Sequence, residues 1–326
     1  VNLRLEPEAD YEITIKLLSG SKDKAVPTLK CELIKDDKFK DITCFVSPEQ
    51  KKRFALPNTV YGNRGIGVSI SPDGKYLLTR YWNNHSLKRS YTYTTLSELK
   101  TGKVLLSNAK EGMRWMPKSN LAYYTRKGMK GTELVTLDPT SKKENILACQ
   151  LPEGSFSFGP TEDYLLFSIR EKGPQERKEI QEILVPDDRQ PGWRNRMFIH
   201  KYDLRTGLFQ RLTYGHTSTY INDVSQDGHY LLFSRREPNL TERPFSRTYI
   251  YKMDLRTMHV DTLIKGEKFV SRAVFSPDAT QLLVDASGEA FDGIGLKIKE
   301  GQTSNTSDGQ LFLYNIADKS IKPLTK

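Results

Sequence analysis

Cysteine is scarce in this sequence: three are present among 326 residues. Cys31, Cys44 and Cys149 are too few and too widely spaced to crosslink a chain of this length. None of them lies in a CxxC or Cys/His metal-binding spacing. We therefore expect ordinary reduced thiols, with a Cys31–Cys44 disulfide as the alternative, and we expect no metal and no other cofactor.

Long hydrophobic runs are also missing. No apolar run approaches the roughly 18 residues that a membrane-spanning helix needs. The first residues, VNLRLEPEAD, have neither the basic start nor the apolar stretch of a signal peptide. The sequence therefore predicts no membrane span, and any export signal would have been removed.

The motifs of common catalytic sites are missing as well. A serine hydrolase of the α/β type carries its nucleophile in a GxSxG turn, and no such pentapeptide occurs. The histidines form no HExxH or HxH pair, so we expect them at surface or turn positions rather than in catalysis. The five histidines are His85, His200, His216, His229 and His259. We predict no catalytic residue and no metal ligand in this chain.

The net charge of +10 comes from 50 Lys and Arg against 40 Asp and Glu. Such an excess can indicate a nucleic-acid partner. Here the basic residues are spread along the whole chain, and most stand beside acidic ones, as in KDDKFKD. This pattern is typical of solvated strand edges, so no nucleic-acid partner is expected.

A repeated phrase is the main feature that is present. It consists of a turn with Pro, Asp or Gly, followed directly by a run of tyrosines and aliphatic residues. The Pro or its equivalent fixes φ, the Asp, Asn or Gly tolerates a left-handed conformation, and the following run is typical of a buried strand. The five copies are SISPDGKYLLT (Ser69 to Thr79), RWMPKSNLAYYT (Arg114 to Thr125), FSFGPTEDYLLFS (Phe156 to Ser168), DVSQDGHYLLFS (Asp223 to Ser234) and AVFSPDATQLLVD (Ala273 to Asp285).

A second phrase follows the first at a variable distance and indicates a β-hairpin. Its apolar strand ends at Asp203 or Asp254, a short loop reverses the chain, and an alternating strand returns. The copies are LVTLDPTSKKENI (Leu134 to Ile146), IHKYDLRTGLFQRLT (Ile199 to Thr213), IYKMDLRTMHVDTLI (Ile250 to Ile264) and LFLYNIADKSIKPLT (Leu311 to Thr325). Together the two phrases supply four antiparallel strands, which is one blade of a β-propeller.

The fold class predicted is all-β, a β-propeller of four-stranded antiparallel blades. Five blades are clear, at about 57 to 106, 107 to 150, 151 to 215, 216 to 266 and 267 to 326. Residues 1–56 form an N-terminal β segment or partial sixth blade, because strand-like runs are present but the repeat phrase is missing. A propeller hides its sheet edges by closing its ring, so we expect an incomplete ring from a parent of about seven or eight blades.

One insertion, residues 170–197, interrupts the third clear blade with helical and loop character. Pro174 suits a first helical turn, Ile180, Ile183 and Leu184 form an apolar stripe, and Pro186 ends it. We therefore predict a helix of about three turns. It would carry Glu179 and Glu182, and the loop after it holds Asp187, Asp188, Arg189, Trp193, Arg194 and Arg196. A solvated excursion held by local ion pairs and a mount for binding residues both remain open.

Repeats of the SPDGKYLLT kind followed by YDLRTG hairpins resemble the TolB-like and prolyl oligopeptidase propellers. The passage VPDDRQPGWRNRMFIHKYDLRTGLFQRLTYG is similar to exported dipeptidyl peptidase IV-like members of that serine peptidase family. The resemblance covers nearly all of residues 57–326. It implies a propeller that admits small peptides to a C-terminal α/β-hydrolase domain, which this sequence does not contain.

In the family, adjacent glutamates on a short propeller helix hold the free amine of the substrate. No Glu-Glu dipeptide occurs here, which departs from the aminopeptidase subtype, and Glu179 and Glu182 at helical spacing are the candidates for that role. The other candidate substrate-binding residues are Asp187, Asp188, Arg189, Trp193 and Arg194.

Two functions follow from these observations. The first is the non-catalytic propeller portion of a serine exopeptidase or oligopeptidase, which gates and positions peptides. The second is a self-contained TolB-like propeller that binds a protein or small ligand. The resemblance favours a periplasmic or secreted location over the cytoplasm. It implies peptide and hydrolase-domain partners and leaves a homodimer open.

Overall fold

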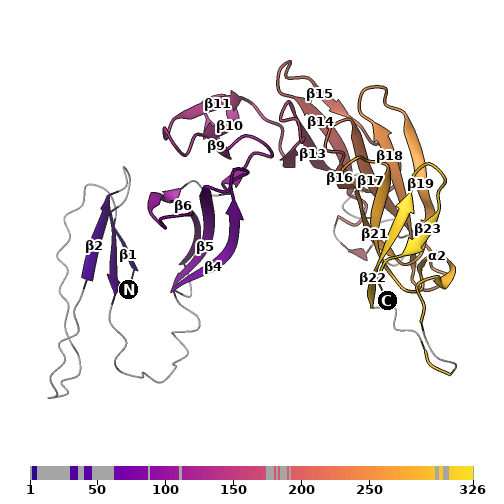
Figure 1. Ribbon diagram of the computed structural model, residues 1–326. Helices are drawn as coiled ribbons and strands as arrows, with labels where there is room; N and C mark the ends of the chain where they lie inside the picture. The colour runs from indigo at the N-terminus through magenta and orange to yellow at the C-terminus, as the bar shows by residue number, and fades with distance from the viewer. Residues whose placement is uncertain are drawn as a thin grey trace. The chain divides into compact units, whose positions relative to one another are not determined.

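The computed structural model describes residues 2–5, 30–35, 40–45, 62–86, 89–109, 112–173, 180, 183, 189–190, 192–297, 301–303 and 308–325. The chain divides into two compact units, Val1–Gln150 and Leu151–Lys326. Each unit is described by itself below (Figure 1).

The first unit contains one three-stranded and two four-stranded antiparallel sheets. The small sheet has the order β1-β3-β2, from β1 (Asn2–Leu5), β2 (Lys30–Lys35) and β3 (Lys40–Phe45). The next consists of β4 (Gly62–Ile70), β5 (Tyr76–Ser86), β6 (Arg89–Glu98) and β7 (Val104–Ala109). The third consists of β8 (Arg114–Trp115), β9 (Ala122–Gly128), β10 (Gly131–Leu137) and β11 (Glu144–Ala148).

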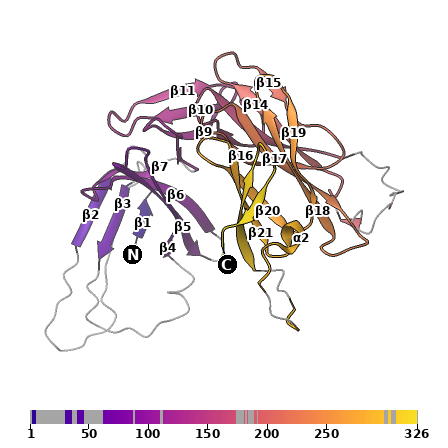
Figure 2. The same cartoon turned by 45° about the vertical axis from the view of Figure 1, so that its right-hand side comes forward.

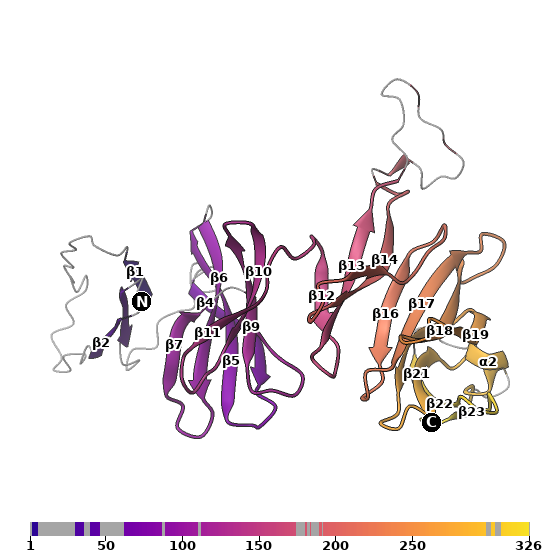
Figure 3. The ribbon, with the colours of Figure 1, turned by 90° about the horizontal axis from the view of Figure 1, so that it is seen from above.

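The second unit contains three four-stranded antiparallel sheets, which follow one another in sequence order (Figures 2 and 3). The first consists of β12 (Ser155–Phe158), β13 (Tyr164–Glu171), β14 (Arg196–Asp203) and β15 (Phe209–Arg211). The second consists of β16 (Thr219–Val224), β17 (Tyr230–Pro238), β18 (Ser246–Asp254) and β19 (Val260–Glu267). The third consists of β20 (Val270–Phe275), β21 (Gln281–Ser287), β22 (Gly309–Asn315) and β23 (Ile321–Pro323).

The first repeated phrase forms the turn between the first two strands of a blade. Ser71 Oγ donates to Asp73 Oδ1 at 2.7 Å and accepts from the backbone N–H of Tyr76 at 2.9 Å. Gly74, with φ of +73°, takes the left-handed position that the turn needs. The same serine and aspartate contacts recur at Ser225 and Asp227, and at Ser276 and Asp278. In each turn the serine hydroxyl lowers the pKa of the aspartate below its usual range.

The second phrase forms the turn between the last two strands. Asp203, the final residue of β14, accepts from the backbone N–H groups of Arg205 and Thr206 at 3.1 and 2.7 Å. Asp254 binds Arg256 and Thr257 in the same way at the end of β18. The carboxylate thus satisfies backbone donors that the tight reversal leaves unpaired, as an Asx turn does.

Neighbouring blades within the first unit pack face to face. Leu78 and Leu96 of one sheet share a buried cluster with Ala122, Tyr124 and Val135 of the next. The indole N–H of Trp115 also donates to the carbonyl of Ser69 at 3.1 Å. These contacts join the two four-stranded sheets of this unit.

The same packing repeats twice in the second unit. Tyr164, Leu166 and Ile199 of the first sheet share a cluster with Leu231 and Phe233 of the second. The next cluster joins Leu232 and Ile250 to Val284, Phe312 and Tyr314 of the third sheet. Two buried tyrosine hydroxyls donate across these boundaries, from Tyr164 to the carbonyl of Gly228 at 3.0 Å and from Tyr314 to that of Leu263 at 2.8 Å.

The prediction of five four-stranded antiparallel blades is confirmed. The sheets span residues 62–109, 114–148, 155–211, 219–267 and 270–323, close to the predicted limits. The described residues also include a short helix, α2 (Ala290–Gly293), of four residues. No helix in the described ranges is long and apolar enough to cross a membrane. A sixth blade from residues 1–56 and the domain limit at residue 57 stay predictions.

The cysteine predictions are answered in part. Cys149 is a free, exposed cysteine. Cys31 and Cys44 are Cα partners in the pairing of β2 with β3, but whether they are bridged lies outside the described side chains.

Candidate binding site at the root of the insertion

The insertion leaves the third blade at the end of β13 and returns at the start of β14. Its flanking residues, Glu171 and Arg196, are opposite each other in the strand register. Just beyond them, the backbone N–H of Gly173 donates to Asn195 Oδ1 at 2.9 Å. A Cβ on Gly173 would lie 2.7 Å from the Cβ of Arg194, so the close approach of the two ends requires glycine here. We call residues 170–173, 193–197 and the following linker, 212–218, the insertion root.

Arg196 binds the returning end of the insertion to that linker. Its Nη1 donates to the carbonyls of Trp193 and Asn195 at 2.7 and 3.1 Å. Its Nε donates to the carbonyl of His216 at 2.6 Å. One guanidinium therefore satisfies three backbone acceptors from two segments of the chain.

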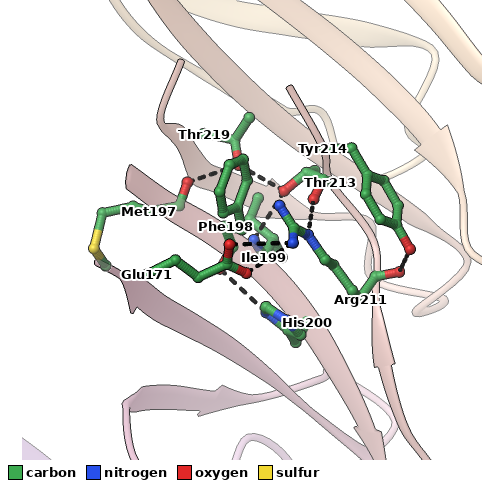
Figure 4. Close-up of polar contacts among 9 residues, drawn as sticks. All are labelled: Glu171, Met197, Phe198, Ile199, His200, Arg211, Thr213, Tyr214 and Thr219. Carbon is green, nitrogen blue, oxygen red and sulfur yellow. Dashed lines mark hydrogen bonds and ion pairs between the residues drawn. The ribbon is translucent and has the colours of Figure 1, made fainter. Parts of the chain in front are cut away.

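Arg211 binds the departing end of the insertion to the same linker (Figure 4). Its Nη1 lies 2.9 Å from Oε1 and 3.1 Å from Oε2 of Glu171, and its Nε donates to the carbonyl of Thr213 at 2.8 Å. The guanidinium carbon lies 3.9 Å from the ring centre of Phe198 and 4.7 Å from that of Tyr214. Ion pairing and two cation–π contacts thus act on one partly buried side chain, which lowers its mobility.

Two threonines complete the polar contacts beside Arg211 (Figure 4). The hydroxyl of Thr213 accepts from the backbone N–H of Ile199 at 2.9 Å and lies 2.6 Å from the hydroxyl of Thr219. Thr219 in turn donates to the carbonyl of Met197 at 3.3 Å. These contacts join the start of the fourth blade to β14 of the third.

His200 is buried in this region, and the prediction of a surface or turn position is wrong for it. It lies within β14 and is 8% exposed. Its ring stacks on Phe209 with the ring centres 5.0 Å apart. Burial lowers the pKa of His200 below its ordinary value, because the charged imidazolium is poorly solvated there.

We expect His200 to make the fold less stable as the pH falls below about 6.5, the ordinary histidine pKa. Because the folded-state pKa is lowered, the unfolded chain binds the proton first, and stability is lost as the pH falls toward the folded-state value. Thermal unfolding from pH 8 to 5 measures the effect. The His200→Gln variant should lose less stability over that range than the wild type, and an equal loss in both proteins would contradict the prediction.

The structure describes three of the predicted binding residues. Arg189 is exposed, Trp193 is 45% exposed, and Arg194 lies against Gly173 at the insertion root. Glu179, Glu182, Asp187 and Asp188 lie outside the described residues. At Ile180 and Ile183 the backbone is irregular rather than helical, and these side chains are 70% and 51% exposed. The predicted apolar stripe is therefore not packed on a neighbour at these two positions.

Sequence reasoning missed Glu171, His200 and Arg211. Glu171 and Arg211 are 40 residues apart and meet because β13, β14 and β15 are adjacent in one sheet. The hairpin phrase places Arg211 on the last strand of the blade. Its contact with Glu171 on β13 depends on the register between β13 and β14, and the insertion between these strands conceals that register. Counting residues in both directions from the hairpin turn at Asp203 would have shown that Arg211 lies opposite His200 in the β14–β15 pairing.

Comparison with known proteins adds no sequence family. No protein-family model matches the chain, and no curated protein matches it.

Among solved structures, the acylaminoacyl peptidase of Pyrococcus horikoshii is similar at 12% identity with a TM-score of 0.50. The match covers 77% of this chain and 37% of the peptidase. The chain itself forms five four-stranded antiparallel sheets in sequence order within its described residues, as the blades of a propeller do. The fold is a β-propeller. At this identity the similarity establishes the propeller fold alone.

Two other solved structures give similar matches. The β-propeller domain of the Trilobed protease from Pyrococcus furiosus is 15% identical with a TM-score of 0.45, covering 91% of this propeller chain and 80% of that one. TolB from Acinetobacter baumannii is 16% identical with a TM-score of 0.39, covering 79% of this chain and 51% of TolB. This propeller chain thus spans about half the length of that TolB chain.

Proposed function

We propose that this chain is the non-catalytic propeller portion of a serine peptidase of the prolyl oligopeptidase family, similar to the dipeptidyl peptidases. It would position peptide substrates for an α/β-hydrolase domain elsewhere in the parent protein. Two observations support the proposal: the passage VPDDRQPGWRNRMFIHKYDLRTGLFQRLTYG, and a blade fold shared with an acylaminoacyl peptidase.

The insertion root is the observation that carries the proposal furthest. Arg196 and Arg211 hold both ends of the insertion with ion pairs, cation–π contacts and hydrogen bonds at 2.6–3.1 Å to backbone carbonyls. These contacts order the two ends of the insertion in advance. For a substrate-binding loop, such ordering lowers the entropy cost of binding.

The residue types of the insertion suit the two ends of a peptide. In this proposal Glu179 and Glu182 hold the substrate ammonium, because paired carboxylates offset its desolvation. Arg189 or Arg194 holds a carbonyl or carboxylate of the peptide, and Trp193 supplies apolar contact. Asp187 and Asp188 lie in the same segment and add negative charge beside the amine end.

Substitution of Glu179 and Glu182 by glutamine in the complete protein tests these roles. Loss of a charge-assisted contact should weaken cleavage of a free-amine peptide by about 1.5–3 kcal/mol in kcat/KM. The N-acetylated form of the same peptide should be cleaved at nearly the wild-type rate. Equal losses for both peptides would mean that the insertion does not hold the amine.

A self-contained TolB-like propeller that binds a protein or small ligand is the second candidate, favoured by the missing GxSxG motif. The two functions differ in the parent gene, where a GxSxG about 200–350 residues downstream of Lys326 selects the peptidase. In either case the chain of 326 residues should not cleave a chromogenic dipeptide, because its sequence has no GxSxG turn to carry a nucleophilic serine. Cleavage by the purified chain that a serine-directed inhibitor blocks would contradict this.

The proposal also includes a periplasmic or secreted location, which fractionation of the source cells would test. A homodimer is a further proposal, and the mass of the complete protein in solution decides it.

A further inference from the structure

We infer that Arg196 and Arg211 are positioning residues that fix both ends of the insertion and so determine how Trp193 is presented. The consequence for peptide binding rests on the proposed function. The placement of Trp193 itself can be measured on the chain alone.

Arg196 acts directly on Trp193. Its Nη1 binds the carbonyl of Trp193 at 2.7 Å, while its Nε binds the carbonyl of His216 at 2.6 Å. The backbone of Trp193 is therefore tied to the linker between the third and fourth blades. Trp193 is 45% exposed, so burial holds it only in part and these backbone hydrogen bonds contribute to its placement.

Arg211 acts from the other end of the insertion. It binds Glu171, the last residue of β13, and Glu171 is the register partner of Arg196. The ring of Tyr214 lies over the Arg211 guanidinium, and its hydroxyl donates to the Arg211 carbonyl at 3.3 Å. Both arginines thus bind the same linker, 212–218, from adjacent strands.

Lysine could not replace either arginine in these roles. A guanidinium is planar and presents five N–H donors in a fixed arrangement, whereas an ammonium is a compact charge on a flexible stem. Arg196 uses two nitrogens for three carbonyls, and Arg211 uses two nitrogens for Glu171 and Thr213. Arginine-to-lysine variants therefore keep the positive charge but lose the planar arrangement of N–H donors.

The first experiment uses the fluorescence of Trp193 as its readout. The chain has three tryptophans, so Trp82→Phe and Trp115→Phe leave Trp193 as the sole indole. In this background, Arg196→Lys and Arg211→Lys should each lower the steady-state anisotropy of Trp193, because its backbone is less firmly held.

Arg126→Lys is the matched control. Arg126 lies on β9 of the second blade, 2.8 Å from Glu133 and 3.1 Å from Glu144, and it is 40% exposed. It has comparable ion pairs but no insertion beside it, so its substitution should leave the anisotropy unchanged. Equal anisotropy in all three lysine variants would overturn the inference.

Thermal unfolding of each variant shows whether it is folded. If Arg211→Lys lacks a cooperative transition, Glu171→Gln takes its place, because it weakens the ion pair with Arg211 while keeping the side-chain size. A folded Glu171→Gln protein with wild-type anisotropy would also overturn the inference.

The second experiment measures the consequence in the complete protein. Arg196→Lys should lower kcat/KM for peptides on the order of tenfold, mainly through KM, with a melting temperature equal to that of Arg126→Lys. If the wild type cleaves peptides and Arg196→Lys has unchanged constants, the positioning role in binding is wrong. If the wild type cleaves no peptide, the proposed function fails, and the anisotropy of Trp193 still decides the inference.

Discussion

Replacement of Phe312 by alanine should destabilise the second unit by about 3–5 kcal/mol, the usual cost of removing a fully buried phenylalanine. Phe312 lies in the middle of β22 with 0% of its surface exposed. It belongs to the cluster that joins the fourth and fifth blades. The ring of Phe291 contacts it edge-on, with the two ring centres 5.3 Å apart. The cavity left by alanine would therefore open at a blade boundary, where both sheets lose contacts. Denaturant unfolding of the wild type and the variant measures the difference.

Phe245→Ala is the control for this prediction. Phe245 is 53% exposed beside β18, so its truncation should change the free energy of unfolding by less than about 0.5 kcal/mol. A loss at Phe312 as small as that at Phe245 would show that the blades do not pack through this cluster.

Replacement of Tyr164 by alanine should cost a similar amount, about 3–5 kcal/mol. Tyr164 is 3% exposed and packs between the third and fourth blades, and its hydroxyl donates to the carbonyl of Gly228 at 3.0 Å. Tyr164→Phe removes the hydroxyl alone and should cost about 1 kcal/mol, since the Gly228 carbonyl loses a buried partner. Unfolding free energies of the two variants separate ring packing from hydrogen bonding.

Gly159 offers a direct test of how closely this ring is held. A Cβ at Gly159 would lie 2.3 Å from the Cζ atom of Tyr164, so Gly159→Ala should cost about 1–3 kcal/mol in the wild type. In the Tyr164→Ala background that cost should largely disappear, because the clashing ring is gone. Gly65→Ala, with no atom within 4 Å of its Cβ, is the neutral reference for crowding. Additive effects at Gly159 and Tyr164 would refute the proposed contact.

The blades were predictable because their signals are local. The turn at Ser71–Gly74 is held by hydrogen bonds between residues two to five positions apart, so the local sequence is enough to specify it. The strand ends at Asp203 and Asp254 were correctly placed for the same reason. Five copies of the first phrase and four of the second then indicate five sheets.

The candidate site was less predictable because its contacts join strands rather than neighbours in sequence. Arg211 contacts Glu171 across β14. Because 24 residues separate Glu171 from Arg196, the sequence pattern does not show that these two residues are paired in the β13–β14 register. His200 looks like an isolated polar residue in the sequence, yet its strand position places it on Phe209. The helix expected at Ile180 and Ile183 rested on apolar spacing between two prolines, and at these residues the structure has irregular backbone and exposed residues.

The contact of Gly173 with Asn195 has an evolutionary consequence. Because the insertion starts and ends at neighbouring points, with a hydrogen bond of 2.9 Å between them, its length can change without altering the spacing of β13 and β14. The insertion is therefore the natural place for engineers to graft foreign loops into the third blade at a small cost in folding stability.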